Sequence, residues 1–263
     1  MKATNVRKVV KTAQLVIGTI GLLAASLAAD VAFADVSKYQ RVLVVVSELD
    51  SSVAPELRGL YGAIEAMTQT SLQGIIASDY GSVHYLKNRD ATAENYGALL
   101  RQLASRPSTL AIDTVMSVHG SPGRLHFADR AVNMASLDRA VFPAGMPANE
   151  QSTLRRKLRM MYNLSCFGRS HNATFRAMGY DIVAGSNGVN ANAGVEFIPT
   201  LTSWKIGGRF VDGFNPTNND AALWIADGLL RAAGEWNHNS LAQTDSKKYF
   251  AGFTSVRINS DPR

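Results

Sequence analysis

One histidine and one cysteine occupy positions from which their side chains could do chemistry together. His119 ends the apolar run at residues 114–118 and is followed by Gly120. Cys166, the single cysteine of the chain, follows a second apolar run at residues 158–165. Both runs have the composition of buried strands. At the carboxyl ends of neighbouring parallel strands, the imidazole and the thiol would meet at one edge of the sheet.

A thiol beside an imidazole is suited to nucleophilic catalysis. An ordinary cysteine has a pKa of about 8.5, and a nearby imidazolium or the amino end of a helix favours the thiolate. Gly120 has no side chain, so a substrate carbonyl can approach its backbone. The N–H groups of Gly120 and Cys166 would then bind an oxyanion, and one such donor stabilises a transition state by about 3 kcal/mol.

The segments upstream of His119 alternate between strand and helix patterns. The β-branched run at residues 41–46 predicts a buried central strand, and a weaker strand is expected at residues 83–86. Ser51 and Ser52 favour a helix start, and Thr92 favours another. The order β-α-β-α-β predicts a mostly parallel sheet covered by helices on both faces, a three-layer α/β/α fold.

The downstream segments are less regular. Residues 121–150 are rich in proline and glycine, and one short helix is expected there at residues 133–140. A helix at residues 172–178 and a strand at residues 180–184 follow. The pattern Thr217-x-x-Asp220 opens a helix that ends near Gly234. The polar stretch from Glu235 on is expected to be an extension that is either loosely ordered or packed on the domain.

The motifs around the two reactive residues resemble those of the caspase-like cysteine peptidases, the group of caspases, metacaspases, legumain, clostripain and gingipain. They stand as Ser-Val-His119-Gly120-Ser-Pro-Gly and Asn-Leu-Ser165-Cys166-Phe-Gly. The resemblance is one of arrangement and covers roughly residues 41–234, whereas the narrow caspase signature is missing. It implies a caspase-like α/β/α fold in which His119 is the general base or acid, Cys166 the nucleophile and Gly120 part of the oxyanion hole.

Several residues near these motifs are candidates for a substrate pocket. Relatives that cleave after basic residues carry an acidic residue two positions before the cysteine; Leu164 stands there and argues against such specificity. Glu48 and Asp50 could add negative charge, and Arg169 could favour an acidic side chain; the alternative for all three is a solvated surface charge. The remaining candidates are Phe167, as a wall residue, and Ser186 and Asn187 in the turn after the strand at residues 180–184.

The first 34 residues have the pattern of a cleavable signal peptide. Four basic residues precede the apolar run at residues 15–29, and Ala32-Phe33-Ala34 fits a signal peptidase site. We therefore expect a periplasmic or secreted protein cut after Ala34, with a retained membrane anchor as the other reading. The segment carries four positive charges and one negative charge, so its removal lowers the net charge from +6 to +3. That balance gives no reason to expect nucleic acid as a partner.

The predicted organisation is thus a signal peptide (1–34), a caspase-like domain (35–234) and a C-terminal extension (235–263). We expect no cofactor, no metal and no stable membrane association after signal cleavage. A metal is not expected because no recognised ligand spacing occurs among His119, His126, His171 and Asp129. The sequence around Ser121 and Ser186 does not fit a serine hydrolase motif, and the turn 185–188 lacks the lysine of a phosphate-binding loop.

Two functions from different classes remain. The favoured one is an exported cysteine endopeptidase that hydrolyses peptide bonds through a Cys/His dyad and a thioester acyl-enzyme. The alternative is a catalytically inactive caspase-like domain that binds a peptide or protein partner; a non-peptidase acyl transfer is a third possibility. The presence of His119, Gly120 and Cys166 together favours the peptidase. A third residue that orients His119 is left open, with Asp113 a candidate only by its nearness in the sequence.

Overall fold

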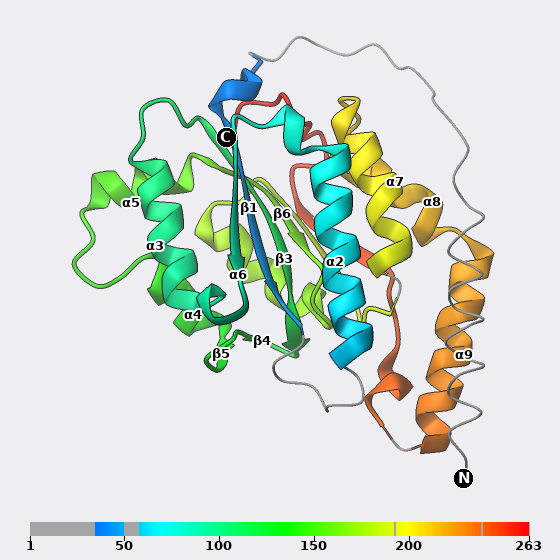
Figure 1. The fold of residues 1–263 in the computed structure, drawn as a ribbon. Coiled ribbons are helices and arrows are strands. Elements are labelled where there is room, and N and C mark those ends of the chain that lie inside the picture. The colour runs from blue at the N-terminus through cyan, green and yellow to red at the C-terminus, as the bar shows by residue number, and fades with distance from the viewer. Residues whose placement is uncertain (1–34, 50–57, 192, 238, 263) are drawn as a thin grey trace. The chain divides into compact units, whose positions relative to one another are not determined.

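The β-branched run after Gln40 forms strand β1 (Arg41–Glu48), all of whose residues are buried. In this computed structural model the described residues are 35–49, 58–191, 193–237 and 239–262 (Figure 1). Strand β1 lies inside a sheet of order β2-β1-β3-β6-β7-β8. The remaining strands of that order are β2 (Ser82–Lys87), β3 (Ala111–Ser121), β6 (Leu158–Asn163), β7 (Ile182–Ser186) and β8 (Lys248–Gly252).

The sheet is mostly parallel. Strands β2, β1, β3, β6 and β7 are paired in parallel, and β8 alone in this order runs antiparallel, against β7. A small hairpin extends β3: strand β4 (Arg124–His126) folds back on the end of β3 and pairs with β5 (Ala131–Asn133). The carboxyl ends of β1, β3, β6 and β7 therefore meet at one edge of the sheet.

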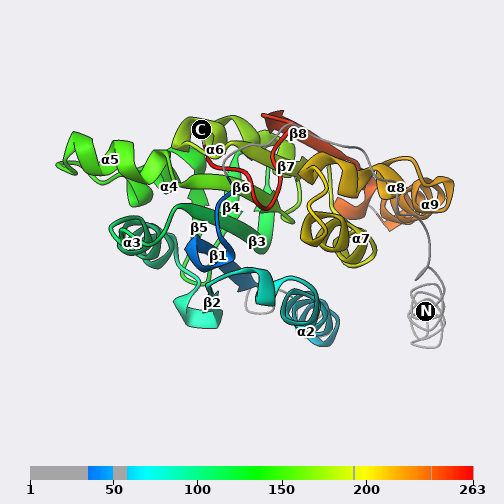
Figure 2. The ribbon, with the colours of Figure 1, turned by 90° about the horizontal axis from the view of Figure 1, so that it is seen from above.

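Helices cover both faces of the sheet, which gives three layers (Figure 2). On one face lie α3 (Ala93–Ala104), α4 (Met134–Val141), α5 (Ala148–Arg155) and α6 (Asn172–Met178). On the other lie α2 (Arg58–Ile75) and α7 (Ala193–Lys205). The short helix α8 (Asn215–Asn218) and the longer α9 (Ala221–Asn237) follow α7.

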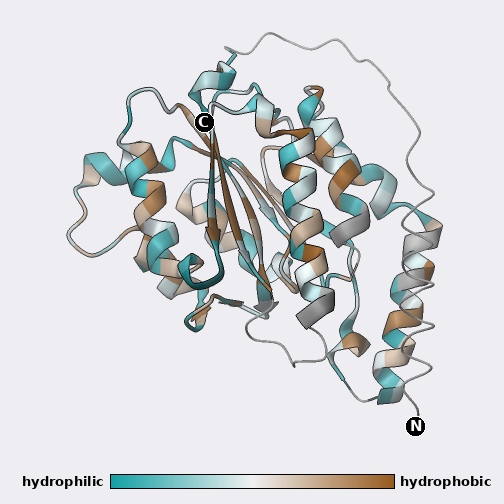
Figure 3. Ribbon diagram, in the orientation of Figure 1, coloured by the Kyte–Doolittle hydropathy of each residue, from teal (hydrophilic) through white to brown (hydrophobic). Residues whose placement is uncertain are grey.

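Alternate residues of β1 pack into the two hydrophobic layers. Val42, Val44 and Val46 face the layer under α3, α4 and α6, whereas Leu43 and Val45 face the layer under α2 and α7. This alternation follows from the period of two in a strand, and it explains why the run is apolar at every position. The central strands accordingly form the most hydrophobic part of Figure 3.

The helix boundaries have local causes. The hydroxyl of Thr92 accepts a hydrogen bond from the N–H of Asn95 at 3.1 Å, so Thr92 caps α3 as the sequence predicts. Helix α6 ends at Gly179, whose φ of 116° is accessible to glycine at little cost. The predicted helix start at Ser51 and Ser52 lies outside the described residues.

The predicted three-layer α/β/α fold is confirmed, but parts of the chain differ from expectation. The stretch after Glu235 was expected to be loosely ordered or packed on the domain, and it contributes β8, which pairs with β7 over Ile182–Ser186. The middle residues of this edge strand are only partly buried. Helices α5 and α7 and the β4–β5 hairpin were not expected either, and α9 ends at Asn237 rather than near Gly234.

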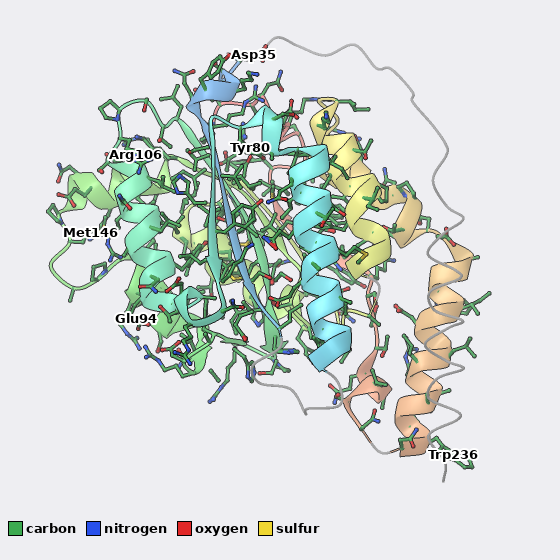
Figure 4. All side chains as sticks on the ribbon, viewed as in Figure 1. Asp35, Tyr80, Glu94, Arg106, Met146 and Trp236 are labelled. Carbon is green, nitrogen blue, oxygen red and sulfur yellow. The ribbon has the colours of Figure 1, made fainter. Side chains whose placement is uncertain are left out.

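None of the helices within the described part of the chain has the length and apolar character needed to cross a bilayer. Helix α9 nevertheless exposes large apolar side chains, among them Trp224, Leu229 and Trp236. Trp236 projects from the end of this helix (Figure 4). The predicted signal peptide lies outside the described residues.

Candidate active site

Strand register places His119 and Cys166 at the same level of the sheet. Strands β3 and β6 are paired in parallel up to Met116 and Asn163, and the N–H of Leu164 donates to the Met116 carbonyl at 2.8 Å. His119 follows Met116 by three residues, and Cys166 follows Asn163 by the same number. The two side chains therefore come from adjacent strand ends at one edge of the sheet.

Gly120 lies directly against the backbone of Cys166. A Cβ atom at Gly120 would come within 2.3 Å of the Cys166 carbonyl oxygen and 3.2 Å of its nitrogen. Real side chains do not approach a backbone oxygen so closely, so only glycine fits this position. The hairpin that carries His119 and the turn that carries Cys166 are in this way held in backbone contact.

His119 is oriented by a backbone carbonyl and by an aromatic ring. Its Nε2 lies 2.8 Å from the carbonyl oxygen of Leu49, just beyond β1. Because a carbonyl can only accept, Nε2 carries the hydrogen, and Nδ1 is the nitrogen left to take a proton. The ring of Tyr61 in α2 packs edge-on against the imidazole, with the ring centroids 4.8 Å apart.

The thiol of Cys166 is partly exposed and has few polar neighbours. The N–H of Asn190, in the loop after β7, points at Sγ over 3.4 Å. Burial raises the pKa of the Cys166 thiol, while the N–H of Asn190 and the positive charge of Lys248 act in the opposite direction. The net effect is a raised pKa, which differs from the lowered one expected from an imidazolium or a helix end. The thiol is therefore protonated near neutral pH, and a nucleophilic attack by it would require a base.

The turn after Cys166 has an unusual backbone. Phe167 has φ 55° and ψ 26°, a left-handed conformation that non-glycine residues seldom adopt, and its N–H donates to the Gly188 carbonyl at 2.7 Å. A Cβ at Gly168 would lie 2.8 Å from the Cα of Gly185, so this turn packs tightly on the end of β7. Such conformations persist only where surrounding contacts enforce them, and they cluster at functional sites.

His171 connects the two halves of the site. Asn163 Oδ1 accepts from the N–H of Ser165, so its Nδ2 faces His171 Nδ1 at 3.1 Å and donates to it. His171 Nε2 consequently carries the hydrogen and donates to the Ser121 carbonyl at 3.0 Å. Burial lowers the pKa of this histidine, which keeps it neutral in that role. The β3–β4 hairpin is thereby tied to the segment around Cys166.

Some of the predicted pocket residues lie beside a cavity near Cys166, whereas the others are buried or lie outside the described residues. Phe167 and Asn187 line a cavity of about 320 Å³ next to the Cys166 turn, and Arg169 donates to Asn187 Oδ1 at 2.9 Å beside it. Leu164 and Ser186 are buried; the Ser186 hydroxyl contacts the carbonyls of Ser165 and Gly188. Glu48 is fully buried at the end of β1, so it is not the solvated charge considered as its alternative. Asp50 lies outside the described residues.

Asp113 does not orient His119. Its carboxylate is fully buried and forms a two-pronged ion pair with Arg159, with distances of 2.9 and 2.6 Å. It also accepts from the hydroxyl of Tyr80, labelled in Figure 4, at 2.6 Å. Asp113 therefore belongs to the buried ion-pair network of the fold. Among the described residues, no three His, Cys, Asp or Glu side chains form a group that could hold a metal ion.

Four groups that contact or influence His119 or Cys166 were not identified from the sequence: the Leu49 carbonyl, Tyr61, Asn190 and Lys248. A backbone carbonyl carries no signal in the residue type, and Tyr61 reads as part of the apolar face of a helix. Asn190 lies two residues beyond the turn 185–188, which was expected at the functional edge, and this nearness was the only available signal. Lys248 belongs to β8, a strand that the sequence did not predict.

No protein-family model matches the chain, and no curated protein matches it. Among solved structures, it is similar to the crystal structure of caspase-1 from Spodoptera frugiperda, with a TM-score of 0.48 and 10% identity over 92% of this chain and 98% of that one. It is also similar to a secreted C11 cysteine protease from Bacteroides thetaiotaomicron, iotapain, with a TM-score of 0.45 and 12% identity over 84% and 90% of the two chains. Any role proposed for His119, Gly120 and Cys166 therefore rests on the geometry of the site.

Proposed function

We propose that the chain is an exported cysteine endopeptidase in which His119 and Cys166 form the catalytic dyad. The observation that carries this proposal is the contact between the His119–Gly120 hairpin and the Cys166 turn, at matched levels of adjacent parallel strands. The orientation of His119 by the Leu49 carbonyl supports it, since Nδ1 is left as the basic nitrogen. The strained backbone at Phe167 supports it as well.

The reaction follows from these roles. His119 Nδ1 takes the proton of the Cys166 thiol as Sγ attacks the carbonyl carbon of the scissile peptide bond. The negative charge that develops on the carbonyl oxygen is bound by the N–H groups of Gly120 and Cys166. His119 then returns the proton to the leaving amine, which departs and leaves a thioester on Cys166. Water, deprotonated by His119, hydrolyses the thioester and restores the thiol.

The raised pKa of Cys166 makes the base essential in this scheme. A preformed thiolate would react with electrophiles without help, whereas a protonated thiol needs its proton removed during attack. The inactive peptide-binding domain, the alternative, needs no such removal. The two functions therefore differ in how strongly the reactivity of Cys166 depends on His119.

The test is covalent labelling of Cys166 by iodoacetamide between pH 5 and 9, combined with cleavage of a peptide library. His119→Ala is compared with His126→Ala, a matched control because His126 pairs with His119 across the hairpin. We expect His119→Ala to slow labelling near neutral pH and to reduce peptide cleavage by about 10²- to 10⁴-fold. His126→Ala should retain most of both activities.

Equal labelling of wild type and His119→Ala, with no peptide cleaved by either protein, would replace the peptidase with the binding domain. Export is tested separately, by expressing the full chain in a bacterium and sequencing the amino terminus of the recovered protein. We expect it to begin at Asp35. Recovery of the intact chain in the membrane fraction would favour the retained anchor.

A further inference from the structure

A buried lysine lies close to the thiol, and neither the motifs nor the proposed reaction use it. Lys248 is the first residue of β8, and its side chain is fully buried. Its Nζ donates to Asn190 Oδ1 at 3.0 Å and lies 2.5 Å from Glu196 Oε1 in α7. It also reaches the Ser246 carbonyl at 3.3 Å. A lysine held so completely out of water requires such partners.

Asn190 links Lys248 to the Cys166 thiol through hydrogen bonds. Its side chain is anchored at both ends, because Oδ1 accepts from Lys248 and Nδ2 donates to the Leu164 carbonyl at 2.8 Å. Leu164 lies two residues before Cys166, so Asn190 joins the cysteine segment to β8. With both ends fixed, the backbone N–H of Asn190 is directed at Cys166 Sγ.

The position of Lys248 is itself fixed by backbone hydrogen bonds. Its N–H donates to Asn218 Oδ1 at 2.9 Å, and its carbonyl accepts from Asn218 Nδ2 at 3.1 Å. The ion pair with Glu196 is supported by the Tyr162 hydroxyl, which donates to the same carboxylate oxygen at 3.1 Å. Among the described residues, the charged or titratable groups linked to Lys248 include Glu196, Tyr162 and the Cys166 thiol, and Asp227 of α9 acts on Glu196.

Lys248 also acts electrostatically on the thiol. Its positive charge lowers the pKa of Cys166 and so opposes the effect of burial. A buried ion pair is also a poor source of stability, because the desolvation of both charges opposes their attraction.

We propose that Lys248 is a positioning residue for Cys166, which aims the Asn190 N–H at Sγ and places a buried positive charge beside the developing thiolate. This inference rests on the proposed function, since it assigns a role in activating the nucleophile of that reaction. It differs from the dyad in a measurable way: Lys248 and Asn190 act on the thiolate itself, whereas His119 acts on the removal of the proton.

The test measures the rate of Cys166 alkylation by iodoacetamide as a function of pH from 6 to 10.5 in the purified chain. Lys248→Met alone leaves the Glu196 carboxylate unpaired, so the informative variant is Lys248→Met/Glu196→Met, which removes both buried charges. Asn190→Ala is the second variant, because Asn190 is only partly buried and the change leaves the backbone N–H in place. Lys247→Met is the matched control, a loss of the same charge from the exposed neighbouring residue.

We expect the midpoint of the alkylation profile to rise by about one pH unit in the double variant, which is a tenfold loss of thiolate at a given pH below the midpoint. Asn190→Ala should shift it in the same direction, and Lys247→Met should leave it unchanged. Circular dichroism and the thermal midpoint establish that each variant is folded. Unshifted profiles in the folded double variant and in Asn190→Ala overturn the proposal, even if the thermal midpoint falls, because the ion pair is then only structural.

His119→Ala, measured in the same series, separates the two proposals. If the profile responds to Lys248 and Asn190 but labelling is unaffected by His119→Ala, the dyad fails while the positioning role stands. If His119→Ala slows labelling and the other variants behave like wild type, the dyad stands and the positioning role fails.

Discussion

Tyr61 packs edge-on against the imidazole of His119, with the two ring planes at 73°. Together with the hydrogen bond from Nε2 to the Leu49 carbonyl, this contact fixes the histidine from two sides. The Tyr61 hydroxyl is also close enough to Cys166 to be affected by its charge. Burial raises the pKa of Tyr61, and the charge of a Cys166 thiolate would raise it further. Helix α2 therefore contributes to the site, although its sequence reads only as a helix with one apolar face.

The Tyr61 contact predicts that the ring matters more than the hydroxyl. Tyr61→Phe keeps the edge-on packing, so we expect peptide cleavage within about threefold of wild type. Tyr61→Ala lets the imidazole rotate, and a misplacement of about 1 Å can cost roughly 10²-fold in rate. The measurement is kcat/KM on a substrate found in the peptide library. If Tyr61→Phe is as impaired as Tyr61→Ala, the hydroxyl itself takes part in the reaction.

The close approach of Gly120 to Cys166 predicts a selective loss of activity in Gly120→Ala. The added methyl group would lie 2.3 Å from the Cys166 carbonyl oxygen, so the hairpin and the cysteine turn must move apart. We expect a fall in kcat of about 10²-fold or more and a destabilisation of about 1–3 kcal/mol. Gly74→Ala in α2 is the control, since its Cβ meets nothing within 4 Å and alanine favours the helix. Equal activity of the two variants would contradict the proposed geometry.

The sequence predicted the central part of the fold well because burial leaves a direct signature there. The runs that became β1, β3 and β6 are apolar at nearly every position, and Thr92 and Gly179 mark helix ends by their chemistry. The paired ends of β3 and β6 then followed from the rule that parallel strands present their carboxyl ends together. The backbone contact between Gly120 and Cys166 agrees with that rule.

The contacts around His119 and Cys166 were not predictable. Whether burial or charge decides the pKa of Cys166 depends on Asn190 and Lys248, which follow Cys166 by 24 and 82 positions. Strand β8 is short, with only three apolar residues between Lys248 and Gly252, so the sequence did not predict a place for Lys248 in the sheet. Asp113, a candidate to orient His119 only because it is near in the sequence, pairs instead with Arg159.

The Asp113–Arg159 ion pair predicts a variant that loses stability without losing catalysis. Asp113→Asn removes the carboxylate that pairs with the buried Arg159 guanidinium and leaves only the more weakly acting Asp181 as a negative charge near it. Breaking a buried pair costs about 3–5 kcal/mol. For a domain of this size, the thermal midpoint should fall by roughly 10 °C. We expect kcat/KM per folded molecule to stay near the wild-type value below that midpoint. A large loss of kcat at an unchanged midpoint would assign Asp113 to the orientation of His119.

The buried tyrosines predict that the fold loses stability at alkaline pH. Tyr96 and Tyr180 are fully buried, with their hydroxyl oxygens 2.5 Å apart, and Thr114 contacts Tyr180 at 2.7 Å. Burial raises the pKa of Tyr96 to about 12, against about 10 in an unfolded chain. A raised pKa favours the folded state fully below pH 10, and this contribution is lost as the pH rises toward 12, because the unfolded chain releases the proton first.

Tyr96→Phe isolates this effect, since it keeps the ring and leaves Tyr180 bonded to Thr114. Urea unfolding followed by circular dichroism at pH 8, 9.5, 10.5 and 11.5 gives the free energy of unfolding of both proteins. We expect wild type to lose about 2 kcal/mol more than Tyr96→Phe between pH 9.5 and 11.5, with the difference growing above pH 10. Parallel curves would mean that Tyr96 ionises as readily in the folded protein as in the unfolded chain, and that water reaches the pair of hydroxyl groups.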